Sequence, residues 1–353
     1  MQERYQAVVL GSSGLVAQRL QQRLMHHPMF TLSAVAGSSE RAGSALLDIP
    51  WRLDDPRPQF PPLQIADIHD HGLPQRLFEM GIRVAFSALP SEQAQTLEPH
   101  WASSGIAVFS NASAHRGKEG VPLVIPEINS HDLRSFGQVG YPLACATNCT
   151  LLPLILPLAP LNQTFGLTQV KMRSEQAISG GGYRLMDEIN ELKHQFNPEI
   201  SGEAEKTAAE LKHILAWDGP ISIRCERVRR NDGHHVFVEA TFDHAVTPNS
   251  AKACLEAWNA SFMGQSHPSA PIVPLHIVEQ IDIEKHLFSD GLSFEDAPNP
   301  ALDLQAGMGV VVGAISCPNP HTVYFEGYSH NTLRGAAGGV IYLAELAASM
   351  DLF

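Results

Sequence analysis

Residues Gln6–Ala17 read QAVVLGSSGLVA, and this stretch decides the fold of the first half of the chain. The apolar run predicts a strand, and the turn formed by Gly11, Ser12, Ser13, Gly14, Leu15 and Val16 leads into a helical pattern. Glycines allow a tight turn and close backbone approach, and the free N–H groups at a helix N-terminus attract phosphate. The pattern predicts a dinucleotide-binding turn, although a loose glycine pattern alone also fits an ordinary tight turn.

Short apolar and β-branched runs alternate with helical patterns through the rest of this half. Strands are predicted at Gln6–Leu10, Thr31–Ala36, Val84–Ala88, Ala107–Phe109 and Leu143–Ala146, and helices at Gly14–Met25 and from Ser91 onward. Such alternation is typical of an α/β fold with a doubly wound parallel sheet. We therefore expect a Rossmann domain over residues 1–148.

The pattern changes after residue 148 to longer alternating strands. They are predicted at Leu167–Ser174, Ile221–Arg229, His235–Phe242, Gly309–Ser316 and Thr322–Gly327. The turn Asn231-Asp232-Gly233 predicts a hairpin between two of them. We expect an α+β catalytic and dimerisation domain with a largely antiparallel sheet over residues 149–330, and a C-terminal helix in residues 331–353 that packs back on the Rossmann domain.

Composition restricts the partners. The 353 residues include 24 basic and 37 acidic side chains, a net charge of −13, which argues against nucleic acid as a partner. The most apolar stretch, Leu151–Leu161, contains three prolines and is too short to span a bilayer, so no membrane partner is expected. Five cysteines without a CxxC pair indicate neither a metal site nor a disulfide framework. Met1-Gln2-Glu3-Arg4 is not followed by a signal-peptide core, so we expect a cytoplasmic protein.

The segment after the second predicted strand bears on the choice of cofactor. It reads Gly37-Ser38-Ser39-Glu40-Arg41. The hydroxyl of Ser38 and the guanidinium of Arg41 suit the 2′-phosphate of NADP, whereas Glu40 leaves NAD possible. A solvated loop charge is the alternative interpretation of Arg41.

Cys149 is the candidate nucleophile. It lies between a predicted strand and an apolar helix, in the sequence Asn148-Cys149-Thr150. The positive end of the helix dipole would lower the pKa of the thiol and favour the reactive thiolate. The alternative is a small, buried, unreactive side chain.

Eight short blocks, taken together, resemble one protein family. They are Gly11–Arg19, Phe86–Ser91, Ser110–Arg116, Pro122–Asn129, Asn148-Cys149, Gln176–Tyr183, Asp232–His234 and Ser329–Gly338. In this order they are similar to the aspartate-semialdehyde dehydrogenases, especially the archaeal and fungal branch. The resemblance implies NADPH-dependent reduction of an aspartyl phosphate, a role in lysine, threonine and methionine biosynthesis, and a homodimer or homotetramer.

The resemblance also implies roles for individual residues. Cys149 takes the place of the nucleophile, His234 of the acid/base residue and Gln176 of the residue that orients the substrate. Arg227 would grip the substrate carboxylate, Glu210 would contact the substrate, and Asn111 with Arg116 would bind phosphate. Ser87, Ser179, Gly180 and Asn331 fall in blocks that surround the cofactor. An imidazole ordinarily titrates near neutral pH, which suits proton transfer by His234, and a planar guanidinium suits a carboxylate.

The sequence departs from the family at one charged position. Three residues after Glu210 the family has Lys, and this chain has His213, which puts the phosphate contacts in doubt. Two alternatives therefore stay open. One is an acyl-CoA reductase of the malonyl-CoA type, which needs no phosphate pocket, and the other is a nucleotide-binding paralogue without catalysis.

Overall fold

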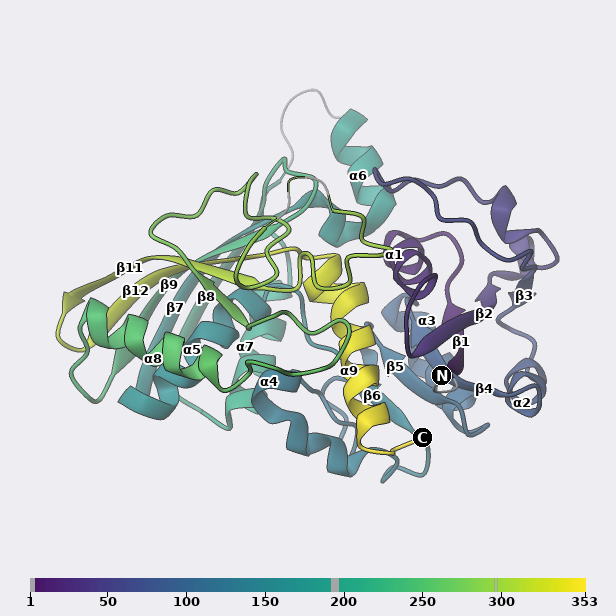
Figure 1. The fold of residues 1–353 in the computed structure, drawn as a ribbon, viewed down its shortest axis with the longest axis horizontal. Coiled ribbons are helices and arrows are strands. Elements are labelled where there is room, and N and C mark those ends of the chain that lie inside the picture. The colour runs from purple at the N-terminus through teal and green to yellow at the C-terminus, as the bar shows by residue number, and fades with distance from the viewer. Residues whose placement is uncertain (1–3, 192–196, 295, 297) are drawn as a thin grey trace.

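The computed structural model describes residues 4–191, 197–294, 296 and 298–353. Two six-stranded sheets lie side by side, and the N-terminus belongs to the first of them (Figure 1). The long strands of the second sheet run away from the first, and the C-terminal helix lies between the two (Figure 1). This is the α/β plus α+β architecture expected from the sequence.

The first sheet is the predicted Rossmann sheet. Its strands are β1 (Tyr5–Leu10), β2 (Phe30–Gly37), β3 (Ile65–Asp67), β4 (Ile82–Ser87), β5 (Ala107–Ser110) and β6 (Leu143–Cys145). The order is β3-β2-β1-β4-β5-β6, and all neighbours are parallel. The order reverses between β1 and β4, and ligands of such sheets bind at this switch point, beyond the carboxyl ends of the strands.

Helices cover both faces of this sheet because alternate strand residues point to opposite sides. The face that includes Val9 and Phe86 packs against helices α1 (Leu15–Leu24) and α9 (Gly338–Ser349). The face that includes Val8 packs against α2 (Leu73–Glu79) and α3 (Ser91–Ala102). The C-terminal helix therefore completes the first core, whereas the boundaries 1–148, 149–330 and 331–353 stay a prediction.

The second sheet is mixed. Its strands are β7 (Leu167–Gln176), β8 (Ile221–Arg227), β9 (His234–Phe242), β10 (Leu275–Ile277), β11 (Val310–Asn319) and β12 (Thr322–Ser329), in the order β10-β11-β12-β9-β7-β8. Three of the five pairings are antiparallel, and β7·β8 and β10·β11 are parallel. Helix α4 (Pro126–Asn129) precedes β6 in the chain, and the helices of the second half are α5 (Leu152–Phe165), α6 (Gly182–Glu191), α7 (Glu203–Leu215) and α8 (Pro248–Ala260).

The predicted hairpin between Ile221–Arg229 and His235–Phe242 is wrong. Strand β7 lies between β8 and β9, so the turn that joins them passes the end of β7. The turn bonds to the segment after β7 instead: Ile178 N donates to Arg230 O at 2.8 Å, and Ser179 N donates to Asn231 O at 3.1 Å. These pairings bring the turn before His234 beside Ser179 and Gly180.

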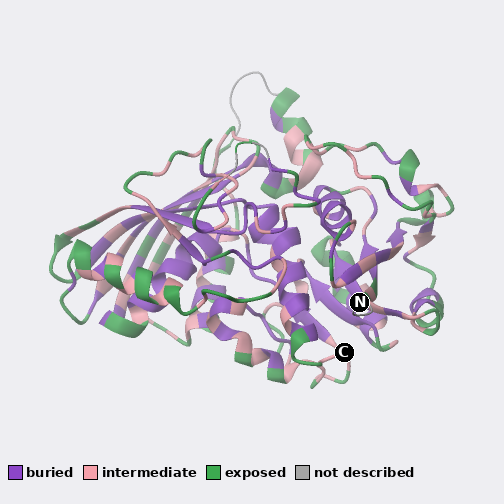
Figure 2. Ribbon diagram, viewed as in Figure 1, coloured by how far each residue is buried: buried purple, intermediate pink, exposed green. Residues whose placement is uncertain are grey.

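Helix α5 is buried along most of its length and packs between the second sheet and α8. Figure 2 shows the central strands of both sheets buried, with exposed residues mainly on outer helix faces and loops. None of the helices in the described part of the chain combines the length and apolar character needed to cross a bilayer. All five cysteines are free.

Candidate active site

A pocket of about 320 Å³ lies between the two sheets and is lined by Asn148 and Cys149, which precede α5. It brings together six of the residues predicted from sequence and Cys149 itself. These six are Val16, Asn111, Arg116, Ser179, Gly180 and Asn331. Glu203 and Lys206 of α7 also line it. Segments that are far apart in the chain therefore meet at this pocket.

The glycine turn connects β1 to α1 as predicted. Gly11 has φ +116°, a conformation that favours glycine, and α1 begins at Leu15. Among the described residues no side chain caps this helix, so its first N–H groups are free to meet a phosphate. Ser12 is buried, and a Cβ at Gly37 would clash with its hydroxyl, so the end of β2 packs tightly on the turn.

Ser38 and Arg41 lie at the end of β2, on the rim of this turn. Ser38 precedes a short 3-10 helix, Ser39–Arg41, and both Ser38 and Arg41 are exposed. The Arg41 guanidinium reaches across to donate to the Ser13 hydroxyl. An exposed hydroxyl and guanidinium thus stand next to the phosphate-binding turn.

Cys149 lies in a half-buried turn on the pocket wall, and its predicted low pKa is wrong. Burial raises the pKa of the Cys149 thiol to about 12, and the Glu203 carboxylate adds to this increase. Arg116 and Arg227 oppose it, as does a hydrogen bond from Thr150. Helix α5 begins only at Leu152, so Cys149 lies outside the first turn, where the helix dipole acts most strongly.

Another segment of the pocket wall packs directly against Cys149. It is a π-helix, Leu333–Ala337, which precedes α9. A Cβ built on Gly335 would clash with the Cys149 Cβ and lie 3.0 Å from its Cα. Only a residue without a side chain fits here, so this glycine keeps the thiol at the edge of the pocket.

His234 and Arg227 lie behind Gly180. A Cβ built on Gly180 would be 2.9 Å from Arg227 Nη1 and 3.2 Å from His234 Nε2. Arg227 Nη1 donates to Ala177 O at 2.7 Å, and the thiol of Cys149 is close enough to perturb the pKa of Arg227. Neither His234 nor Arg227 lines the pocket directly, but the backbone of Gly180, which does, lies against both.

His234 does not titrate near neutral pH, contrary to the expectation from sequence. Complete burial, and then the charge of Arg227, lower its pKa well below the ordinary value. Its Nδ1 accepts from Ala177 N at 3.2 Å, which places the proton of the neutral ring on Nε2. That nitrogen has no hydrogen-bond partner among the described residues. His234 is therefore a neutral donor at its Nε2.

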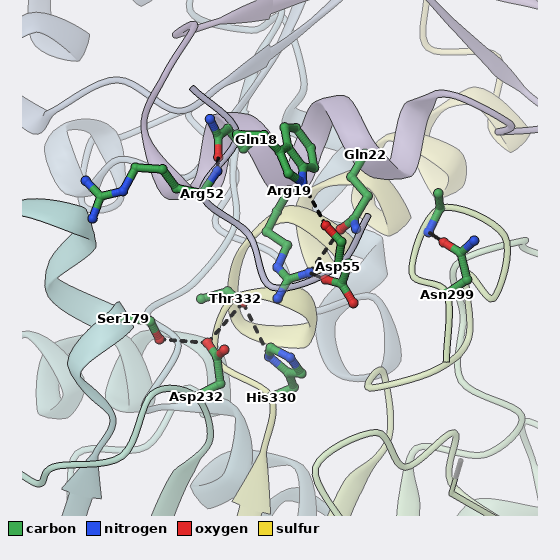
Figure 3. A network of polar contacts seen from close by, with 12 residues as sticks. Gln18, Arg19, Gln22, Arg52, Asp55, Ser179, Asp232, Asn299, His330 and Thr332 are labelled. Atoms are coloured by element: carbon green, nitrogen blue, oxygen red, sulfur yellow. Dashed lines mark hydrogen bonds and ion pairs between the residues drawn. The ribbon is translucent and has the colours of Figure 1, made fainter. Parts of the chain in front are cut away.

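Asp232 holds the turn before His234 in place. Its carboxylate accepts from Ser179 Oγ at 2.8 Å and from Thr332 Oγ1 at 3.4 Å, and Thr332 also contacts His330 (Figure 3). Asn331 completes the arrangement, since its Nδ2 donates to Ser179 Oγ at 2.8 Å and its Oδ1 accepts from Gly233 N at 2.7 Å. Sequence reasoning gave Asp232 only a turn role, although an acidic residue beside a candidate catalytic histidine was the available signal.

Asn111 and Arg116 lie on a loop after β5 and share the pocket with Cys149. Arg116 Nη2 donates to Asn111 O at 2.7 Å, and Arg116 Nη1 pairs with Glu210 Oε1 at 2.9 Å. The other Glu210 oxygen accepts from Asn148 N at 2.6 Å. Buried Glu210 thus has a protein partner on each oxygen and ties the Arg116 loop to the residue before Cys149.

Lys206 was missed by sequence reasoning. Its side chain is exposed, lines the Cys149 pocket with Asn111 and Arg116, and has no ion-pair partner within the described ranges. His213, two turns later on α7, lines a separate surface hollow with Lys118 and Arg134. The position that raised doubt about phosphate therefore lines another hollow, and a different lysine lines the pocket of the thiol.

Two predicted residues lie just outside the pocket wall. Gln176 ends β7, is buried, and donates from Nε2 to Ser174 Oγ at 3.3 Å. Ser87 ends β4, and its carbonyl accepts from Asn111 N at 3.2 Å and Asn111 Nδ2 at 3.3 Å. Ser87 thus supports the loop that carries Asn111, whereas the Gln176 side chain bonds within β7.

Residues 6–136 match the family model described as semialdehyde dehydrogenase, NAD binding domain. With the parallel sheet and its glycine turn, this match defines the class: the chain is an oxidoreductase of the semialdehyde dehydrogenase type. An aspartate-semialdehyde dehydrogenase of Archaeoglobus fulgidus is 34% identical, over 97% of this chain and 98% of that protein. The chain therefore belongs to the aspartate-semialdehyde dehydrogenase family, which confirms the resemblance seen in the sequence.

Two further relatives bear on function. A crystal structure of aspartate-semialdehyde dehydrogenase with NADP from Candida albicans superposes with a TM-score of 0.78, is 28% identical, and covers 99% of this chain and 100% of that one. A malonyl CoA reductase (NADP) of Metallosphaera sedula is 26% identical over 98% of this chain and 97% of that protein. Relatives that match nearly the full length of this chain thus carry two different names, aspartate-semialdehyde dehydrogenase and malonyl CoA reductase.

Proposed function

We propose that the protein catalyses the reversible, NADP-dependent and phosphate-dependent interconversion of L-aspartate 4-semialdehyde and 4-phospho-L-aspartate. One observation carries the proposal: the Cys149 thiol shares a single pocket with the cations Arg116 and Lys206 and with Val16 of the glycine turn. A thiol, an anion-binding group and a dinucleotide turn are the three parts that a phosphorylating aldehyde dehydrogenase requires.

The residues present fit a dinucleotide. The positive φ of Gly11 and the uncapped start of α1 provide free N–H groups for a pyrophosphate. Ser38 and Arg41 would hold the 2′-phosphate, which favours NADP over NAD. When bound, the nicotinamide ring accepts or supplies the hydride.

Cys149 is the proposed nucleophile. Its sulfur would add to the aldehyde carbon, and loss of hydride from the resulting hemithioacetal would leave a thioester on Cys149. Phosphate then attacks the thioester carbon, the C–S bond breaks, and the acyl phosphate leaves. Because burial and Glu203 keep the free thiol protonated, its proton would pass to the carbonyl oxygen as sulfur adds, and the hydroxyl of the hemithioacetal would release it to solvent when hydride leaves. Arg116 and Arg227 favour the thiolate during the addition.

His234 would act as a hydrogen-bond donor to the reacting oxygen. Its neutral Nε2–H can donate to the oxygen that becomes negative when sulfur adds, and it requires no prior protonation of the ring. Asp232, Ser179 and Asn331 hold the turn and the Gly180 backbone beside it. These three residues therefore act by positioning.

Arg227 and the anion-binding loop would bind the two ends of the substrates. Arg227 is half-buried next to Cys149 and can offer a planar fork to the carboxylate of the aspartyl group. Asn111, Arg116 and Lys206 would receive phosphate on the other side. Glu210 would keep Arg116 in place rather than contact substrate, because both of its oxygens already have protein partners.

Reduction of NADP by aspartate semialdehyde, followed by absorbance with and without phosphate, tests the proposal. We expect turnover only when phosphate or arsenate is present, and a loss of about 10⁴-fold or more in Cys149→Ala. Cys145→Ala is the matched control, since Cys145 is buried in β6 away from the pocket wall. Turnover of Cys149→Ala at the wild-type rate would refute the mechanism.

A malonyl-CoA-type reductase is the second candidate because one relative carries that name. The His213 replacement that favoured it loses its weight, since Lys206 rather than His213 faces the thiol. Oxidation of NADPH by malonyl-CoA at a rate above that with aspartyl phosphate would favour this candidate.

Assembly and cellular role follow from the family as further proposals. We expect a homodimer or homotetramer, a cytoplasmic location and a part in lysine, threonine and methionine biosynthesis. Light scattering on the purified protein and growth rescue of a strain that lacks the activity would test these expectations.

A further inference from the structure

One face of α3 holds the loop that carries Asn111 and Arg116. Ser91 Oγ accepts from Ser113 N at 3.2 Å, and Ala94 O contacts His115 Nε2 at 3.1 Å. Glu98 Oε1 accepts from Ser110 Oγ at 2.6 Å. Positions 91, 94 and 98 are three and four residues apart, so they lie on one side of the helix.

Glu98 is the least expected member of this face. It is fully buried, although a carboxylate is rarely buried without a charged partner. Its Oε2 has no hydrogen bond within the described residues and faces His115 Nε2 at 3.6 Å. The Ser110 hydroxyl that Glu98 binds also accepts from Ala112 N at 3.0 Å, so the carboxyl group is linked through Ser110 to the backbone of the loop.

Several groups face this carboxyl group from the elements around it. His115 and Arg116 come from the loop, Cys145 from β6, and the hydroxyls of Ser110 and Ser87 from β5 and β4. The Ser87 hydroxyl is close but does not meet the geometry of a hydrogen bond. Burial raises the pKa of Glu98 to about 7, and Ser110, Ser87 and Arg116 limit the rise. The group therefore changes its charge in the neutral range.

We propose that Glu98 is a positioning residue that sets the affinity of the Asn111–Arg116 loop for phosphate. Through Ser110 it holds the loop in both of its charge states. When ionised, it also places a negative charge behind the loop, and this charge weakens the binding of a phosphate anion. The inference rests on the proposed function, which assigns phosphate to this loop.

Calorimetric binding of inorganic phosphate to the full-length protein tests the inference. Glu98→Gln keeps the acceptor for Ser110 and removes the charge. Glu79→Gln, at an exposed position of α2, is the matched control for loss of a carboxylate. The ratio of wild-type to variant dissociation constants cancels the ionisation of phosphate itself.

We expect Glu98→Gln to bind phosphate about threefold more tightly than wild type at about pH 8, and equally at about pH 6. Glu79→Gln should match wild type at both. A ratio that is the same at the two pH values would overturn the role of Glu98.

A second measurement needs no variant and keeps the inference testable if Glu98→Gln does not fold. Inorganic sulfate does not titrate near neutrality, so its binding to wild type in buffers of different protonation enthalpy reports protons taken up by the protein. We expect uptake of a fraction of a proton at about pH 7, and none at about pH 9. Sulfate binding without uptake at about pH 7 would contradict the inference. Both readouts are equilibrium binding, so loss of the proposed turnover alone would leave them measurable.

Discussion

The cofactor turn and the thiol pocket are built in opposite ways. Residues 11–16 form the turn as one continuous segment between β1 and α1, whereas the thiol pocket collects residues from seven segments between positions 16 and 336. The properties of the turn follow from its own backbone. Those of the pocket follow from residues distant in sequence, such as Glu203 beside Cys149 and Glu210 beside Arg116. Local sequence is therefore a good guide to the first and a poor guide to the second.

Among the variants that test this contrast, replacement of His234 should change kcat the most. His234→Asn should lower kcat about 10²- to 10⁴-fold, because the donor at the reacting oxygen is lost. His235→Asn is the matched control: the next residue on β9 points the other way and contacts Glu326 at 3.0 Å. Because the pKa of His234 is far below its usual value, the ring is already neutral at pH 6.5, and wild-type kcat/KM should show no inflection there. An equal loss of kcat in His234→Asn and His235→Asn would contradict a specific role of His234 as the donor.

A second test compares two lysines of the same helix, Lys206 and Lys212. Lys206→Ala should raise KM for phosphate about 10- to 100-fold, because a charge-assisted contact is lost, whereas Lys212→Ala should leave it unchanged. Steady-state kinetics with varied phosphate measure both. If His213→Lys lowered that KM while Lys206→Ala did not alter it, phosphate would bind two turns further along α7, at the hollow that His213 lines.

Arg41 tests whether the turn region reads the 2′-phosphate. Arg41→Ala should raise KM for NADP about tenfold and leave KM for NAD within a factor of about two. The ratio of the two cofactors in parallel assays is the measurement, and wild type supplies the reference. Equal changes for both cofactors would mean that Arg41 only stabilises the turn through Ser13.

Glu203 should give the smallest effect, a change in thiol reactivity. Removing its charge in Glu203→Gln lowers the pKa of Cys149, so alkylation by iodoacetamide should be about two- to fivefold faster at about pH 8. Glu205 lies two residues further along α7 and is exposed, so Glu205→Gln should behave as wild type. In wild type the alkylation rate should keep rising with pH beyond about 9, the range where an ordinary thiol levels off. A plateau near that pH would show that burial does not control this thiol.

The same contrast explains which features could be predicted from sequence. The parallel sheet, the glycine turn and Cys149 follow from patterns of a few neighbouring residues. The predicted hairpin before His234 was wrong because an Asn-Asp-Gly turn specifies that the chain reverses but not that the two strands it joins pair with each other. Strand β7 lies between β8 and β9. The predicted ionisation of Cys149 and His234 was wrong for a similar reason. Burial and the charges of other residues determine both pKa values, and at Cys149 they outweigh the nearby helix. Lys206 was missed because only the tertiary fold shows that it, and not His213, lines the pocket of the thiol.

A single-turnover experiment without phosphate tests the central claim most directly. If Cys149 carries the acyl group, aspartate semialdehyde and NADP should give a rapid burst of NADPH stoichiometric with subunits and then stop. Intact-protein and peptide mass spectrometry should locate an aspartyl thioester on Cys149, which added phosphate removes. Steady NADPH formation without phosphate, or a burst that leaves Cys149 unmodified, would contradict the account.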